Sequence, residues 1–124
     1  MLQLRSMLNV ADNSGAKVVQ LIGIPSKGNR KYAYLGEVIT VVVKQAIPYG
    51  QVASGEIVKA VIVRTRKETR RKDGSYIRFD ENACVVLAAA DSVEPKGSRI
   101  FGPIAKELKD KGFNKIASLA EEIY

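Results

Sequence analysis

Cationic side chains gather in one short segment of the chain, residues 59–78. This segment holds eight basic and two acidic residues, so it carries +6 of the chain's net charge of +7. Five of the eight cations are arginines, whose planar guanidinium groups match the geometry of phosphate oxygens. A dense cluster of one sign is typical of proteins that bind polyanions such as nucleic acids. The alternative is an ordinary solvent-exposed charged surface. The large excess of positive over negative charge argues against it.

Catalytic and metal-binding chemistry has few residues to work with. The 124 residues include no His and one Cys, Cys84, which excludes His-dependent nucleophilic triads, intrachain disulfides and Cys/His zinc sites. The glycines at 50 and 55 have the spacing of a phosphate-binding loop, but Glu56 and Ile57 replace its Lys and Ser or Thr. We therefore expect that the protein is not an enzyme and binds no cofactor. Cys84 is interpreted as a small apolar residue of the core.

Short β-strands separated by turn residues position the basic segment. Runs rich in β-branched residues predict five strands, and Pro, Gly, Asn and Asp punctuate the connections. Five short strands within about 90 residues indicate a mainly β fold with a small closed or nearly closed five-stranded barrel. We expect a single domain over 1–124, with the barrel over about 1–100. The predicted strands are 7–10, 17–24, 37–44, 57–65 and 83–87.

The last part of the chain, about 102–124, changes to helical periodicity. Pro103 stands where a first helical residue is favoured, and Gly112 is a natural stop. A second short helix is predicted from Asn114, a residue type favoured at the N-cap. Its apolar stripe, expected to pack onto the barrel, consists of Ile116, Leu119, Ala120 and Ile123.

The basic segment itself contains a strong hairpin signal, Asp73-Gly74. With these two residues as the turn, Arg71 is predicted opposite Tyr76. Neither face of such a hairpin is apolar enough to cover a core, so we expect a ribbon over about 64–80 that projects from the barrel. Ile77 and Phe79 are expected to anchor its base. Because an isolated ribbon is marginally stable in water, we expect it to be mobile without RNA.

The candidate RNA-binding residues are the cations of the basic segment with one tyrosine among them, and a second set in a Gly- and Ser-containing loop that suits phosphate contacts. The first set is Lys59, Arg64, Arg66, Lys67, Arg70, Arg71, Lys72, Tyr76 and Arg78, and the second is Lys27, Arg30, Lys31 and Tyr32.

Several motifs at fixed spacing resemble one known family. Ala60-Val61-Ile62-Val63 is followed after nine residues by Asp73-Gly74, and then by Phe79, Asn82 and Val85-Val86. Further matches lie at 7–16, 44–48, 78–80 and 99–103. Over essentially its whole length the chain resembles the universal uL-type family of bacterial large-subunit ribosomal protein fourteen. It departs where the family often has a basic pair, here Ala53-Ser54, and where it often has Ala-Pro-Glu, here Ala120-Glu121-Glu122, so the last helix is expected to run further.

The resemblance implies a five-stranded barrel, a projecting β-ribbon and two small C-terminal helices. It also implies binding to large-subunit (23S-type) rRNA in the cytoplasmic ribosome, a place at the subunit interface and bridges to small-subunit rRNA. Implied protein neighbours are large-subunit ribosomal proteins three and nineteen and a ribosome-silencing factor, without a homo-oligomer. The implied partner or bridge surface consists of Lys44, Ser98, Arg99 and Lys115.

Two other functions stay open on the residues alone. An OB-like barrel acting as a single-strand binder or translation-factor module would use stacked aromatic side chains, of which the chain has eight. A protein-interaction adaptor would tolerate neutralisation of residues 64–72. A membrane partner is not expected, because the longest apolar run, 83–90, is far shorter than the roughly 20 residues of a membrane span.

Overall fold

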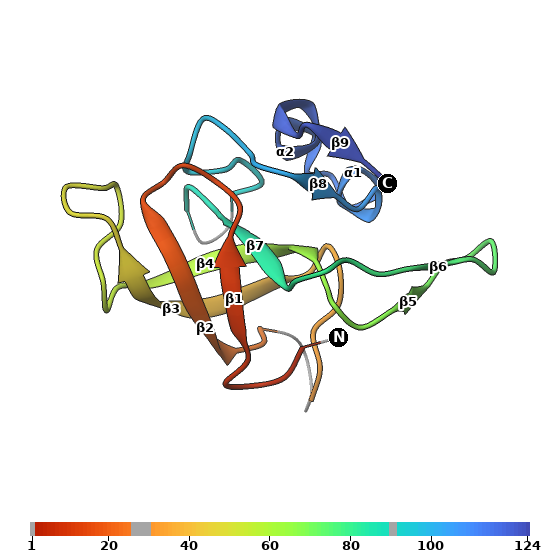
Figure 1. The fold of residues 1–124 in the computed structure, drawn as a ribbon, viewed down its shortest axis with the longest axis horizontal. Helices are drawn as coiled ribbons and strands as arrows, with labels where there is room; N and C mark the ends of the chain where they lie inside the picture. Colours follow the sequence, from red (N-terminus) through yellow and green to blue (C-terminus); the bar gives the residue numbers. More distant parts are fainter. Residues whose placement is uncertain (1, 26–30, 90–91) are drawn as a thin grey trace.

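The computed structural model describes residues 2–25, 31–89 and 92–124. Its centre is a closed barrel with the strand order β1-β2-β3-β4-β7 (Figure 1). Neighbouring strands are antiparallel except β1 and β7, which run parallel and close the barrel. The predicted five-stranded barrel is thus confirmed. Its strands are β1 (Met7–Val10), β2 (Ala16–Gly23), β3 (Val38–Ala46), β4 (Ile57–Arg64) and β7 (Ala83–Val86).

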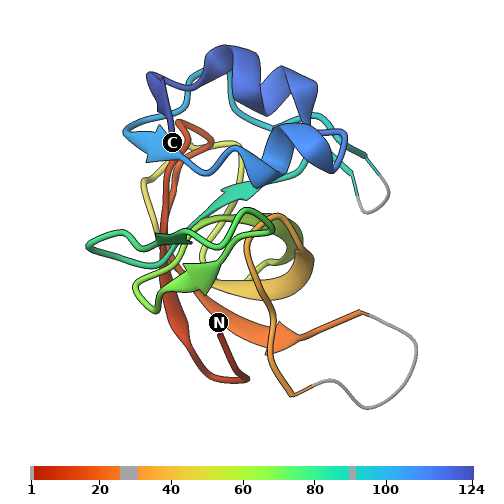
Figure 2. The ribbon, with the colours of Figure 1, turned by 90° about the vertical axis from the view of Figure 1, so that its right-hand side faces the viewer.

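The barrel strands bury two separate cores. Along β3, the fully buried Ile39 and Val41 alternate with half-buried neighbours, as expected for a strand with one face inside the barrel. The end of β4 does not alternate, because Ile62 points into the barrel core while Val61 and Val63 belong to a second core. That second core lies between the outer face of β4 and β7 and the C-terminal region, which covers one side of the barrel (Figure 2).

The C-terminal region contains two short helices, as predicted, but the first begins later and the second ends earlier than the sequence indicated. Helix α1 (Glu107–Asp110) starts four residues after Pro103, and helix α2 (Asn114–Leu119) includes Asn114 as its first residue without a side-chain cap. The stop at Gly112 is confirmed by its left-handed φ of +94° and by the Phe113 N–H, which donates to the Leu108 carbonyl at 2.9 Å. In the described part of the chain, no helix has the length and apolar character that crossing a membrane requires.

Residues that were expected to be helical, before α1 and after α2 in the chain, form a small parallel sheet instead. It pairs β8 (Pro103–Ile104) with β9 (Glu122–Ile123). The prediction that the last helix runs further is therefore wrong, because α2 ends at Leu119 and the Tyr124 N–H donates to the Ile104 carbonyl at 2.9 Å. The backbone at 103–105 is fixed as well by the Ala105 N–H, which donates to the Val63 carbonyl at 3.3 Å.

The basic segment forms the predicted ribbon, β5 (Thr69–Arg70) paired with β6 (Tyr76–Ile77), which projects from the barrel (Figure 1). Its register differs by one residue from the prediction, because Arg70 rather than Arg71 lies opposite Tyr76. The turn is a three-residue loop, 72–74, with Gly74 at a φ of +90° and the Arg71 N–H donating to the Ser75 carbonyl at 2.8 Å. A one-residue slip moves every side chain to the other face, so Arg70 now shares a face with Tyr76.

Candidate nucleic-acid interface

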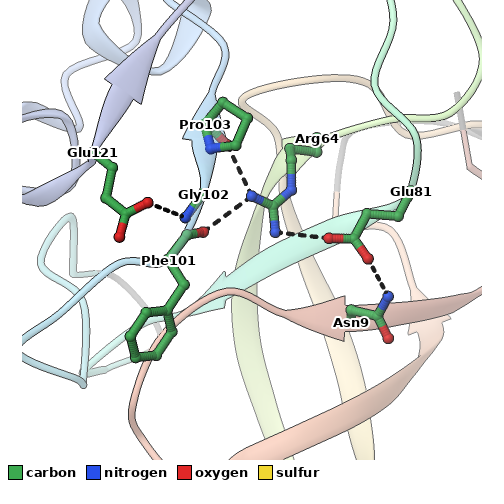
Figure 3. Close-up of polar contacts among 7 residues, drawn as sticks. All are labelled: Asn9, Arg64, Glu81, Phe101, Gly102, Pro103 and Glu121. Carbon is green, nitrogen blue, oxygen red and sulfur yellow. Dashed lines mark hydrogen bonds and ion pairs between the residues drawn. The ribbon is translucent and has the colours of Figure 1, made fainter.

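Arg64 is the last residue of β4, and its side chain lies between Glu81 and the residues that begin the C-terminal region (Figure 3). Its Nη1 donates to the carbonyls of Phe101 and Pro103, both at 3.0 Å, and its Nη2 forms an ion pair with Glu81 Oε1 at 3.1 Å. The Arg64 side chain is only 8% exposed. Sequence reasoning placed Arg64 among the phosphate-binding cations, whereas the structure engages its terminal nitrogens with other parts of the chain.

The contacts of Arg64 extend into a network that joins β1 to the C-terminal region. Glu81 Oε2 accepts a hydrogen bond from Asn9 Nδ2 at 2.6 Å, and the Gly102 N–H donates to Glu121 Oε2 at 3.2 Å (Figure 3). Gly102 has a φ of +77°, and a Cβ placed there would lie 2.4 Å from Arg64 Nη1. A side chain at position 102 would therefore strain the backbone and displace the Arg64 guanidinium from its carbonyl partners.

Burial changes the electrostatics of this network. It lowers the pKa of the Arg64 guanidinium, and the neighbouring Glu81 carboxylate opposes that shift. Arginine nevertheless stays protonated in proteins. Arg64 is therefore a buried cation whose charge is compensated within the chain.

Arg71 is another cation of the basic segment whose guanidinium has partners within the chain. Its Nε lies 3.1 Å from Glu107 Oε1 of α1, and its Nη2 donates to the carbonyl of Tyr124. The Arg71 and Glu107 side chains are only 14% and 22% exposed. This pair connects the ribbon, next to its turn, to the C-terminal region.

The remaining cations of the ribbon segment point to solvent. Tyr76 is exposed as well and lies on the same ribbon face as Arg70. The half-buried Ile77 and Phe79 pack against the barrel core, which confirms their predicted anchoring role. The exposed cations are Arg66, Lys67, Arg70, Lys72 and Arg78.

A groove runs between one side of the ribbon and strand β8. Its walls include Tyr76, Arg78 and Phe79 from the ribbon, and Pro103 and Tyr124 from the C-terminal region. Cationic, aromatic and apolar surface are thus combined along one groove, which suits contact with phosphates, sugars and bases.

The other predicted RNA-binding residues come from two further places. Lys59 lies half-buried on β4, and its Nζ donates to Thr40 Oγ1 at 2.5 Å. Lys31 and Tyr32 are exposed beside Ala33, whose N–H donates to the Leu2 carbonyl at 2.7 Å. Lys27 and Arg30 lie outside the described residues.

The predicted partner surface is composed of three separate elements. Ser98 and Arg99 form an exposed loop that is held by Asn13, whose Oδ1 accepts hydrogen bonds from both backbone N–H groups at 2.8 and 3.0 Å. The Arg99 guanidinium lies over the Phe101 ring, 5.6 Å from its centroid. Lys44 is exposed on β3, and Lys115 is exposed on α2.

The family model of ribosomal protein L14p/L23e matches residues 1–124. The chain belongs to the ribosomal protein L14p/L23e family. A protein of Aquifex aeolicus (strain VF5) is 60% identical over 123 residues, and one of Aquifex pyrophilus is 59% identical over the same length. Each match covers 99% of both chains, and both relatives are named large ribosomal subunit protein uL14. Membership confirms the resemblance seen in the sequence and identifies a structural ribosomal protein rather than an enzyme.

Sequence reasoning missed the anionic and amide residues that position these surfaces in the L14p/L23e chain. Glu81 and Glu107 were not singled out as partners of the arginines, since each is distant from its partner in sequence. The roles of residues 12–15, which connect β1 to β2, depend on the tertiary structure. Asp12 is buried, and its Oδ2 accepts a hydrogen bond from the Val86 N–H at 3.0 Å, which links the turn to β7.

Besides Arg64, the titratable side chains that are buried in the described part of the chain include Asp12 and Cys84. Burial raises the pKa of Asp12, although hydrogen bonds from Ser14 and Val86 lower it in part. Burial also raises the pKa of the Cys84 thiol, far above its usual range. Cys84 is fully buried in β7 of the L14p/L23e fold, in agreement with its interpretation as a core residue.

Proposed function

We propose that the chain is a structural component of the large ribosomal subunit that binds large-subunit rRNA through its ribbon. The observation that carries the proposal is a projecting ribbon whose exposed cations face solvent while Arg64 and Arg71 hold it to the rest of the chain. Membership of the L14p/L23e family and the names of the two Aquifex relatives support the same function. The corresponding compartment is the cytoplasmic ribosome.

The mode of RNA binding follows from the kinds of side chain on the ribbon. The major groove of an A-form RNA helix is too deep and narrow for side chains to read. The exposed arginines and lysines therefore contact phosphates and 2′-hydroxyls and recognise the shape of the RNA. The ring of Tyr76 stacks on an unpaired base or a sugar. Arg64 and Arg71 position the ribbon, and their guanidinium groups make no direct phosphate contact in this proposal.

We assign the remaining predicted residues to flanking contacts. Lys31, Tyr32 and Lys59 extend the RNA-binding surface around the barrel. The partner and bridge surface is proposed on Lys44, Ser98, Arg99 and Lys115, toward small-subunit rRNA, large-subunit ribosomal proteins three and nineteen, and a ribosome-silencing factor. The loop at 98–99 suits a docking role because Asn13 fixes its backbone and leaves its side chains exposed.

The salt dependence of RNA binding tests the ribbon. Each phosphate contact adds about 0.7–0.9 to the slope of log K against log salt concentration. Replacing Arg66, Arg70 and Lys72 together by Ala should lower the slope for large-subunit rRNA by about 2–3 units. The control variant removes three exposed lysines elsewhere, Lys17, Lys109 and Lys111, and should lower it by less than 1. Equal changes of the slope in the two variants would show that the ribbon does not contact the RNA.

Sedimentation of cell lysates through a sucrose gradient tests the cellular assignment. The proposal expects the protein in the fractions that contain large ribosomal subunits and whole ribosomes. Recovery of the protein only at the top of the gradient, free of subunits, would contradict the ribosomal function.

A further inference from the structure

We propose that Glu107 is a positioning residue for RNA binding, acting through its ion pair with Arg71. The pair holds the cationic ribbon in the orientation in which its exposed side chains meet RNA. Glu107 itself makes no contact with RNA. This inference rests on the proposed function. It adds to the residues on which RNA binding depends an acidic one, although the binding surface is basic.

The ion pair lies at the end of the ribbon that most needs support. Arg71 directly follows β5 and precedes the turn, so the pair with Glu107 connects the outer part of the ribbon to α1. The attachments at the base of the ribbon are different. There the Phe79 N–H donates to the Thr65 carbonyl at 2.9 Å, and the Arg66 N–H donates to Asn82 Oδ1 at 2.8 Å.

Glu107 is presented by a fixed element. It is the first residue of α1, and the next residue, Leu108, is fully buried in the second core. Ile104 and Ile116 are buried in the same core. In contrast, the ribbon has strands of two residues each and no core of its own, and isolated ribbons are marginally stable. The ion pair therefore restrains the ribbon by attaching it to a helix that the core holds in place.

The pair is poorly solvated, which increases the consequence of removing one partner. Both carboxylate oxygens of Glu107 and the Nε of Arg71 are buried, and within the described residues none of the three has a hydrogen-bond partner. The 3.1 Å separation therefore represents an ion pair without well-aligned hydrogen-bond geometry. Removing the carboxylate would leave the mostly buried Arg71 guanidinium with its contact to the backbone oxygen of Tyr124 and no side-chain carboxylate, which favours movement of the ribbon into water.

Positioning and simple electrostatics predict opposite effects on RNA affinity. A carboxylate near a polyanion site repels RNA, so neutralising Glu107 would strengthen binding if charge alone mattered. If Glu107 positions the ribbon, neutralising it must weaken binding. Asp110 provides the matched control, because it lies on the same helix, is exposed, and lines the groove between α1 and the ribbon without an ion pair to Arg71.

The experiment compares Glu107→Gln with Asp110→Asn at one salt concentration, using large-subunit rRNA transcribed in vitro. We expect Glu107→Gln to bind about fivefold more weakly, as when the binding-competent fraction of the ribbon falls to about one fifth. Asp110→Asn should bind as tightly as the wild type or slightly more tightly. Binding of Glu107→Gln that is unchanged or tighter would overturn the proposal.

Amide hydrogen exchange in the free protein provides a readout that needs no RNA. Amides of residues 69–77 should exchange about fivefold faster in Glu107→Gln, with barrel amides unchanged. The reversed pair Arg71→Glu with Glu107→Arg restores the ion pair but not the contact to Tyr124, so its amides should exchange more slowly than those of Glu107→Gln. Equal exchange in wild type and Glu107→Gln would overturn the proposal irrespective of RNA. If the wild-type protein binds no rRNA, the proposed function fails while the exchange result still decides whether the pair orders the ribbon.

Discussion

Replacing Arg64 by Met would remove the guanidinium that joins three parts of the molecule while keeping a long side chain. The carbonyls of Phe101 and Pro103 would lose their shared donor, and Glu81 would lose its ion pair. We expect the protein to fold, because the apolar cores do not include the guanidinium, but with a weaker attachment between the barrel and the C-terminal region.

The magnitude follows from the three contacts. Each lost hydrogen bond from the guanidinium to a carbonyl costs about 1.5 kcal/mol, the low end of the range for charged donors, because water reaches the exposed Phe101. The ion pair adds about 0.5 kcal/mol, because Glu81 is 45% exposed and solvent screens it. Removal of a desolvated charge offsets part of this cost. The net loss is about 2 kcal/mol, or about one tenth to one third of the roughly 6–19 kcal/mol expected for a chain of this length.

Urea unfolding monitored by circular dichroism measures this loss. With a slope of about 1.5 kcal/mol/M, a cost of 2 kcal/mol lowers the midpoint by about 1.3 M. Arg66→Met is the matched control, because Arg66 carries the same side chain two residues further along and is exposed; its cost should stay below about 0.5 kcal/mol. A midpoint for Arg64→Met that equals that of Arg66→Met would refute a bridging role for Arg64.

Three further predictions concern the barrel. Tyr49 is fully exposed at a φ of +63°, so Tyr49→Asn should raise the free energy of unfolding by about 0.5–1 kcal/mol; a lower urea midpoint would contradict this. Burial raises the pKa of Asp12 above its unfolded value of 3.8, so the native state binds the proton more tightly. As pH rises from about 3.8 through the raised pKa, the wild type should therefore lose stability relative to Asp12→Asn. A gain in stability over the same pH range would contradict a raised pKa of Asp12. The buried Cys84 thiol, with its pKa raised by burial, should react with a thiol reagent only as fast as the protein unfolds; rapid reaction of the native protein would show that β7 opens locally.

The sequence identified the barrel strands because their signal is local. Val38–Ala46 and Ile57–Arg64 are rich in β-branched residues and bounded by turn residues, so each strand is specified by its own composition. The helices were located less well. Pro103 has a type favoured at the start of a helix, but the backbone around it is engaged by Arg64 and β9, and those partners are distant in sequence.

In the ribbon, the sequence predicted the hairpin but not its register, which differs by one residue. Asp73-Gly74 predicted the turn, but Gly74 takes the left-handed position of a three-residue loop, and Asp73 Oδ1 accepts the Ser75 N–H at 3.0 Å. This choice of loop shifted the register and moved Arg70, rather than Arg71, to the face of Tyr76. Composition alone does not distinguish the two hairpin geometries, because both use Asp and Gly.

The sequence by itself determined the class of the protein. A charge of +6 in residues 59–78, no His and one Cys excluded His-dependent triads and Cys/His zinc sites and indicated a polyanion binder. These properties depend only on counts and local spacing. Only the tertiary structure decided what each arginine does. Arg64 and Arg71 are near exposed arginines in sequence, yet folding brings Glu81 and Glu107 to them. The same type of side chain is therefore either an internal support, where a distant carboxylate contacts it, or an exposed cation.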